Sequence, residues 1–189
     1  TLDRSSAASD VYKRQPQAVA KMLADIGLTA GTEQIVTSAQ AVLQLAAEEV
    51  PAGAKLLIIG ADSLRDLARE MGFKVVSSAD DKPAAVVQGF DRSVGWEHLT
   101  EGALAIRQGA KFFASNLDTS LPIERGLAVG NGSLVAAIQS ATGVEPVSAG
   151  KPEPAMFTFA AKQIGAKKPL AVGDRLDTCL LYTSPSPRD

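Results

Sequence analysis

Apolar residues follow two patterns along this chain, helical spacing and short unbroken runs. Residues 17–26 carry apolar side chains three and four positions apart, which predicts a helix that stops at Gly27. Residues 55–60 form an unbroken apolar run ended by Gly60, which is typical of a strand buried on both faces. The same patterns predict further helices over 38–50, 63–71, 96–108, 131–142 and 155–164, and further strands over 34–37, 74–77, 84–89, 111–115 and 169–172.

Strands alternate with helices in this order, so the sequence predicts an α/β fold with largely parallel sheets. Ser38 is the expected N-cap of the second helix, and Pro51 and Gly53 are expected to end it.

The two ends of the chain share an unusual relation at the level of DNA. Residues 11–15 (VYKRQ) can be encoded by GTG TAT AAG AGA CAG. The reverse complement of that stretch, read one base later, encodes Cys-Leu-Leu-Tyr and the start of Thr, which is the sequence of residues 179–183. We therefore interpret residues 1–15 and 179–189 as translated sequencing-adaptor sequence, and leave them out of fold arguments. The alternative is a Ser-rich leader and a Ser/Pro-rich tail.

Composition excludes several classes of protein. Without the two end segments the count of Lys and Arg falls from 19 to 15 and that of Asp and Glu from 21 to 18, with no basic stripe. Nucleic acid is therefore not an expected partner. The single cysteine, Cys179, lies in an end segment, which excludes disulfides and thiolate chemistry from the rest. No apolar run approaches membrane-spanning length, so we expect a cytoplasmic protein with no membrane partner.

Candidate chemistry gathers near the C-terminal end. Lys151 lies in a Gly-Lys-Pro-Glu-Pro segment, and Asp174 follows 23 residues later in Val-Gly-Asp-Arg-Leu-Asp-Thr. One helix and one strand fit between them, so both can reach the carboxyl edge of a parallel sheet, where ligands bind. An ammonium group and a carboxylate at that edge suit a phosphate and its Mg²⁺ ion. Spacing alone leaves the alternative of a solvated loop lysine and a turn aspartate.

These two segments resemble the third and fourth motifs of the haloacid dehalogenase superfamily, in its NagD-like, para-nitrophenylphosphatase-type branch (subclass IIA). Further segments fit that branch in the same order: Val36–Ala39, Gly60, Trp96, Ala114–Asp118 and Gly130–Leu134. The resemblance implies a partial Rossmann-like core, over residues 16–38 and 148–178, and a large inserted α/β cap over residues 39–147.

The resemblance also implies roles for individual residues. Lys151 would stabilise the nucleophile and the phosphoryl group, and Asp174 would bind Mg²⁺. Members of the family form an aspartyl-phosphate on the first Asp of an Asp-x-Asp motif, and the second Asp acts as general acid and base. This chain contains no Asp-x-Asp, and Cys179 stands where a further acid is expected, so we expect an inactive fragment of a phosphatase. Asp177 is not assigned as a ligand.

The cap region offers weaker candidates. Asn116 and Asp118 follow a strand and could face the substrate, or simply form a turn. Glycines 126, 130 and 132 could offer N–H groups to an anion, or permit tight turns. His98, the single histidine, is expected on the surface.

Two other functions compete with a phosphatase that acts on a small phosphorylated metabolite. A signalling receiver domain also combines an Asp, a metal site and a Lys, but it has no room for an insertion of this length. A non-enzymatic module could bind a phosphometabolite through the cap alone. The resemblance also implies a possible homodimer formed through the cap.

Overall fold

A computed structural model describes residues 7–9, 16–151 and 153–167 of the 189-residue chain. Asp174, Asp177 and the strand expected over 169–172 lie outside these ranges. Within the described ranges no helix is long and apolar enough to cross a membrane, and the cytoplasmic location stays a prediction.

The centre of the structure is a five-stranded sheet in which every neighbouring pair is parallel. Its strands, in spatial order, are β4 (Lys74–Val76), β3 (Lys55–Ile59), β5 (Ala85–Gln88), β6 (Lys111–Ala114) and β9 (Val147–Ser148). The predicted α/β fold with a parallel sheet is confirmed.

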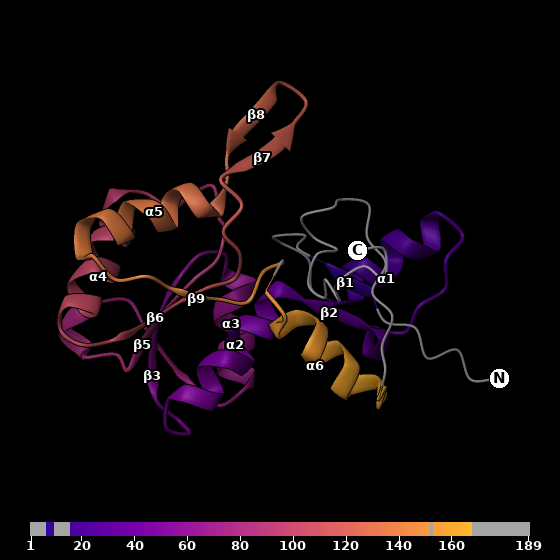
Figure 1. Cartoon of the computed structure of the whole chain (residues 1–189), viewed down its shortest axis with the longest axis horizontal. Coiled ribbons are helices and arrows are strands. Elements are labelled where there is room, and N and C mark those ends of the chain that lie inside the picture. Colours follow the sequence, from indigo (N-terminus) through magenta and orange to yellow (C-terminus); the bar gives the residue numbers. More distant parts are fainter. Residues whose placement is uncertain (1–6, 10–15, 152, 168–189) are drawn as a thin grey trace, which may run out of the picture.

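Helices cover both faces of this sheet (Figure 1). Leu56 and Ile58 of β3 point into a cluster with α2 (Ser38–Glu49) and α3 (Asp62–Glu70). Leu57 and Ile59 point the other way, into a cluster with α4 (Trp96–Arg107) and α5 (Asn131–Thr142). The four residues after Lys55 are all buried, as expected for a strand covered on both faces.

A second, smaller sheet pairs β1 (Ala7–Ser9) with β2 (Ile35–Thr37) in parallel. Near it lie α1 (Pro16–Asp25) and α6 (Ala155–Ile164) (Figure 1). β1 falls inside the segment interpreted as adaptor sequence. Backbone pairing does not report where a segment comes from, so that interpretation stays a prediction.

One hydrophobic cluster joins the small sheet to the large one. Val36 of β2 and Met156 of α6 are completely buried in the same cluster as Leu56 of β3, with side chains of α2 between them. This cluster contains residues from both sides of the predicted cap boundary at residues 38–39, and that boundary stays a prediction.

Local capping differs from expectation at one position. Thr37, not Ser38, is the N-cap of α2: its Oγ1 accepts a hydrogen bond from the Gln40 amide at 3.3 Å, and Gln40 Oε1 accepts one from the Thr37 amide at 2.9 Å. The prediction for Ser38 is wrong because its neighbour forms the complete capping box. Gly27 ends α1 as predicted, with a φ of +86°.

The structure also contains strands that the sequence pattern did not predict. The strands β7 (Ser120–Ile123) and β8 (Gly126–Val129) form an antiparallel hairpin that projects from the body (Figure 1). Most of its residues are exposed, so it carries little of the alternation that burial imposes on a strand. β9 has only two residues, too few for a periodic signal. Two short 3₁₀ turns, Thr32–Gln34 and Ala79–Asp81, were also not predicted.

Truncation of a central core side chain should be far more costly than truncation of an exposed one. Leu56 is completely buried, whereas Leu104 on α4 is 45% exposed. We expect Leu56→Ala to lower the free energy of unfolding by about 2–5 kcal/mol, and Leu104→Ala to change it by less than about 0.5 kcal/mol. Urea denaturation followed by circular dichroism measures both. Equal losses would contradict the assigned core.

Candidate functional site

The carboxyl ends of β6 and β9 lie next to each other at one edge of the large sheet. Phe113 and Ala114 pair with Val147 and Ser148, and the Ala149 amide donates to the Ala114 carbonyl at 2.9 Å. After these pairs, β6 continues into residues 115–119 and β9 continues into residues 149–151. Parallel pairing therefore brings the segment of Lys151 to the same edge as the segment of Asn116 and Asp118.

Gly150 is the point of closest approach between these segments. A Cβ atom at this position would lie 2.6 Å from both Cα and Cβ of Asn116, and 3.0 Å from the Ser115 carbonyl oxygen. Only glycine fits without a backbone shift. The backbone just before the half-buried Lys151 is thus held against Asn116.

Asn116 and Asp118 differ in their exposure. Asn116 is 1% exposed. Its Oδ1 accepts a hydrogen bond from the Asp118 amide at 3.2 Å, and its Nδ2 donates to Ser115 Oγ at 3.2 Å. The Asn116 side chain therefore shapes the loop, and Asp118, which is only half-buried, is the more accessible of the two.

The expected meeting of Lys151 with Asp174 involves a residue outside the described ranges, so it stays a prediction. Across the part of the chain that the structure describes, no three His, Cys, Asp or Glu side chains gather as a group that could hold a metal ion.

Two of the three candidate glycines serve close packing rather than anion binding. The Gly130 amide donates to the Thr119 carbonyl at 2.9 Å and the Gly132 amide to the Asp118 carbonyl at 2.8 Å, so neither is left for an anion. A Cβ would lie 2.3 Å from the Asp118 oxygen at Gly130, and 2.1 Å from the Leu117 oxygen at Gly132. Gly126 has a φ of +120° and lies at the turn of the β7–β8 hairpin.

Two buried polar residues near this edge were missed from sequence. Asn131, completely buried at the start of α5, donates from Nδ2 to the Asn116 carbonyl at 2.8 Å. Gln88, also completely buried, is the last residue of β5. A polar residue at the end of an apolar run was the available signal for Gln88, and the Gly-Asn-Gly sequence was the signal for Asn131.

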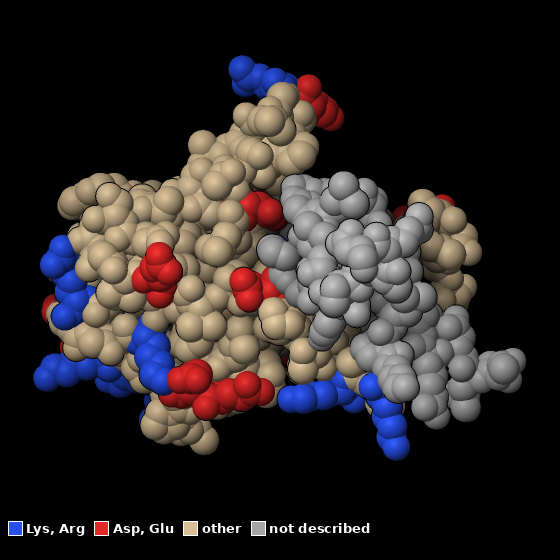
Figure 2. All heavy atoms as spheres, in the orientation of Figure 1, with Lys and Arg blue, Asp and Glu red and all other residues tan. Residues whose placement is uncertain are grey.

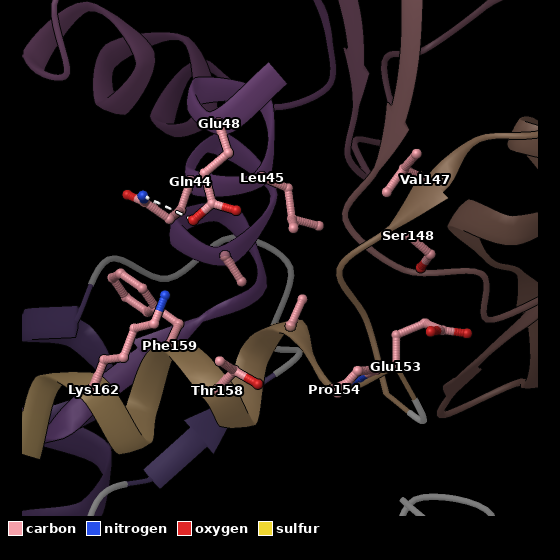
Figure 3. Close-up of a pocket in the computed structure, with 12 residues that line it drawn as sticks. Gln44, Leu45, Glu48, Val147, Ser148, Glu153, Pro154, Thr158, Phe159 and Lys162 are labelled. Carbon is pink, nitrogen blue, oxygen red and sulfur yellow. Dashed lines mark hydrogen bonds between the residues drawn. The ribbon is translucent and has the colours of Figure 1, made fainter. Parts of the chain in front are cut away.

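A cavity of about 280 Å³ lies beside residues 149–151, here named the Lys151 loop, with Ser148 and Glu153 in its lining (Figure 3). Its apolar lining includes Leu45 of α2 and Phe159 of α6, and the carboxylates of Glu48 and Glu153 lie on its sides. Lys151 itself is not among the lining residues.

The expectation that His98 lies on the surface is confirmed. His98 is exposed, and its Nδ1 accepts a hydrogen bond from the Gly95 amide at 3.3 Å, which assigns it to the start of α4. Figure 2 shows acidic and basic side chains interspersed on the visible face, without a continuous basic surface.

Comparison with known proteins gives a consistent picture. A family model described as haloacid dehalogenase-like hydrolase matches residues 11–74. The chain is 47% identical over 165 residues to a D-glycerol 3-phosphate phosphatase of Mycobacterium tuberculosis, which covers 87% of this chain and 47% of that protein. It is 34% identical over 190 residues to the 5'-nucleotidase YutF of Bacillus subtilis, which covers 93% of this chain and 73% of that protein.

Solved structures agree with these matches. A glycerol phosphate phosphatase from Mycobacterium tuberculosis, in complex with magnesium, superposes with a TM-score of 0.88 at 44% identity, over 95% of this chain and 54% of that one. A double mutant of a thermostable NPPase from Geobacillus stearothermophilus gives 0.86 at 35% identity, over 92% of this chain and 70% of that one. The chain thus spans about half the length of the mycobacterial relative and 64% of an acid sugar phosphatase from Staphylococcus saprophyticus.

Addition of a methyl group at the Gly150 contact should destabilise the fold. We expect Gly150→Ala to lower the free energy of unfolding by about 1–3 kcal/mol, because the new Cβ overlaps Asn116. Gly95→Ser is the control, since its Cβ would meet no atom within 4 Å and serine is favourable at the N-cap of α4. Urea denaturation compares the two variants, and equal effects would argue against close packing at Gly150.

Proposed function

This chain belongs to the haloacid dehalogenase-like hydrolase family, and from that membership we propose that the protein containing it is a Mg²⁺-dependent phosphatase of small phosphomonoesters. The observation that carries the proposal is the edge of the large sheet, where the Lys151 loop packs against Asn116. That edge is where a parallel sheet binds its ligands. The relatives named above are phosphatases or a 5'-nucleotidase.

In this proposal Lys151 neutralises charge on the transferring phosphoryl group. Gly150 supports that role, because its contact with Asn116 limits how far the backbone of Lys151 can move. Asp174 is proposed as a ligand of Mg²⁺, which would supply electrostatic stabilisation of the phosphate oxygens. The nucleophile would be the first Asp of an Asp-x-Asp motif in the same protein, and these 189 residues contain no such motif.

Residues 39–147 are proposed to be the cap that covers the reacting phosphate. The large sheet and the helices on its two faces support this, since they form between β2 and the Lys151 loop. A cap of this kind excludes water and selects the leaving group. Asp118 is the candidate for contact with the substrate, and Asn116 holds the loop that carries it.

The competing functions make different demands on the chain. A receiver domain has no room for an insertion as long as residues 39–147 between its motifs, and this length argues against that function. If the longer protein also lacked an Asp-x-Asp motif, that would favour the second candidate, a module that binds a phosphometabolite without hydrolysing it. Activity of a longer protein that contains this chain separates the two.

The 189-residue chain should not hydrolyse para-nitrophenyl phosphate above the level of its own Lys151→Ala variant, because no residue here can accept the phosphoryl group. A longer protein with the chain and an Asp-x-Asp motif should release phosphate. In that protein we expect Lys151→Ala to lower kcat by about 10²–10³-fold, and EDTA to abolish a turnover that Mg²⁺ restores.

The matched control is Lys74→Ala, which removes an exposed lysine from β4. It should leave kcat unchanged within experimental error. A longer protein that binds phosphate but never releases it from an ester would support the binding module instead.

We also propose that the protein forms a homodimer through the β7–β8 hairpin. Pairing of Pro122 with Leu127 and of Ser120 with Val129 places these residues on one face of the hairpin. Leu127 is 76% exposed and Val129 is 59% exposed. Figure 2 shows charged side chains at the hairpin tip, where the turn holds Glu124 and Arg125, and none along the rest of its visible side. An exposed apolar face on a two-stranded hairpin with free outer edges is typical of an interaction surface.

Charge placed on this face should weaken the dimer. We expect sedimentation velocity to show a dimer for the chain, and Leu127→Glu to raise its dissociation constant by at least about tenfold, since a carboxylate would enter an apolar interface. Trp96→Glu is the control: Trp96 is 78% exposed at the start of α4, where an acid is favourable. A monomeric wild-type chain would refute the dimer.

A further inference from the structure

The first turn of α5 lies directly on the loop that follows β6, here named the β6–β7 loop (residues 115–119). Four hydrogen bonds join them: Gly130 amide to Thr119 carbonyl at 2.9 Å, Asn131 Nδ2 to Asn116 carbonyl at 2.8 Å, Gly132 amide to Asp118 carbonyl at 2.8 Å, and Ser133 Oγ to Thr119 carbonyl at 2.8 Å. The first three residues of the helix and the glycine before them therefore all donate hydrogen bonds to this one loop.

The same loop is held from its other side by Gly150. Gly130 and Gly132 touch its backbone from the α5 side, and Gly150 touches Asn116 from the side of β9. All three positions are too close to the loop for a Cβ. The β6–β7 loop is thus packed between the start of α5 and the turn that leads into Lys151, and glycines make the closest backbone approaches on both sides.

The hairpin is anchored in this arrangement at both of its ends. β7 begins at Ser120, one residue after the loop, and β8 ends at Val129, one residue before Gly130. The bond from the Gly130 amide to the Thr119 carbonyl closes the base of the hairpin. A tilt of the hairpin must therefore move the β6–β7 loop or break bonds to α5.

Asn131 is the fully buried side chain among these hydrogen-bond donors. Its Oδ1 has no hydrogen-bond partner among the described residues, and neither amide atom of Gln88 has one. Strand alternation places Gln88 on the α4 and α5 face with Val86, in register with Ala114 of β6. Buried polar groups that lack partners cost stability, so their presence beside this loop is better explained by positioning than by packing.

We propose that Asn131 is a positioning residue that couples the β7–β8 hairpin to the Lys151 loop through the backbone of Asn116. The significance of Lys151 rests on the function proposed above, whereas the coupling rests on the contacts alone. A partner bound to the hairpin would then act on the geometry around Lys151 and Asp118 without touching either.

Hydrogen exchange of the 189-residue chain, followed by mass spectrometry, tests the coupling directly. Three amides report on it: Asp118, which donates to Asn116 Oδ1, Gly150, which donates to Ser148 Oγ, and Glu153, which donates to the Gly150 carbonyl. We expect Asn131→Ala to raise exchange roughly tenfold in peptides that cover Asp118 and also in those that cover Gly150 and Glu153, because one buried hydrogen bond is lost. Peptides from β3 should not change.

Ser133→Ala is the matched control, since it removes a bond to Thr119 but none to Asn116. It should raise exchange near Thr119 and leave Gly150 and Glu153 unchanged. Should Asn131→Ala fail to fold, Asn131→Ser replaces it, because serine is tolerated at a helix start but is too short to reach the Asn116 carbonyl.

Faster exchange confined to the β6–β7 loop, or spread evenly over the chain, would overturn the coupling. In a longer, active protein Asn131→Ala should lower kcat more than it raises KM. Coupled exchange in a protein that hydrolyses no phosphomonoester would refute the phosphatase proposal and leave the coupling intact.

Discussion

The parallel pairing of β6 with β9 is the contact on which the candidate site depends. It is only two residues long on the β9 side, yet it returns the chain to the sheet edge beside Asn116. Gly150 then allows the two backbones to touch, and Lys151 follows immediately. Any side chain at position 150 would push these segments apart, because even a Cβ would overlap Asn116. The site therefore depends on a glycine at this position.

The rest of the structure holds that edge in place by burial. Both faces of the sheet are covered, and the cluster on one face continues through α2 into β2 and α6. Because α6 begins just after the Lys151 loop, its packing against α2 fixes the far end of that loop. The region proposed as a cap and the flanking pieces therefore share one hydrophobic cluster in this chain.

Buried polar side chains near the site have a different role from the apolar side chains of the core. Asn116, Asn131 and Gln88 are all buried, and two of them leave amide atoms without partners among the described residues. An apolar core would be more stable there, but it would not hold the β6–β7 loop in one register against α5. The exposed hairpin above that loop ties the proposed dimer surface to the proposed site through the same few residues.

The sequence by itself determined the α/β class, the largely parallel sheet and the main helices. Strands buried on both faces have unbroken apolar runs and helices have apolar residues at helical spacing, and both patterns are local. It also identified Lys151, Asn116 and Asp118 as candidates, through motif order. Only the tertiary structure decided that Asn116 faces its own loop, that Gly130 and Gly132 serve backbone contact, and that Asn131 reaches Asn116. Those facts arise from contacts between segments distant along the chain, and an exposed hairpin or a two-residue strand imposes no periodic pattern from which they could be read.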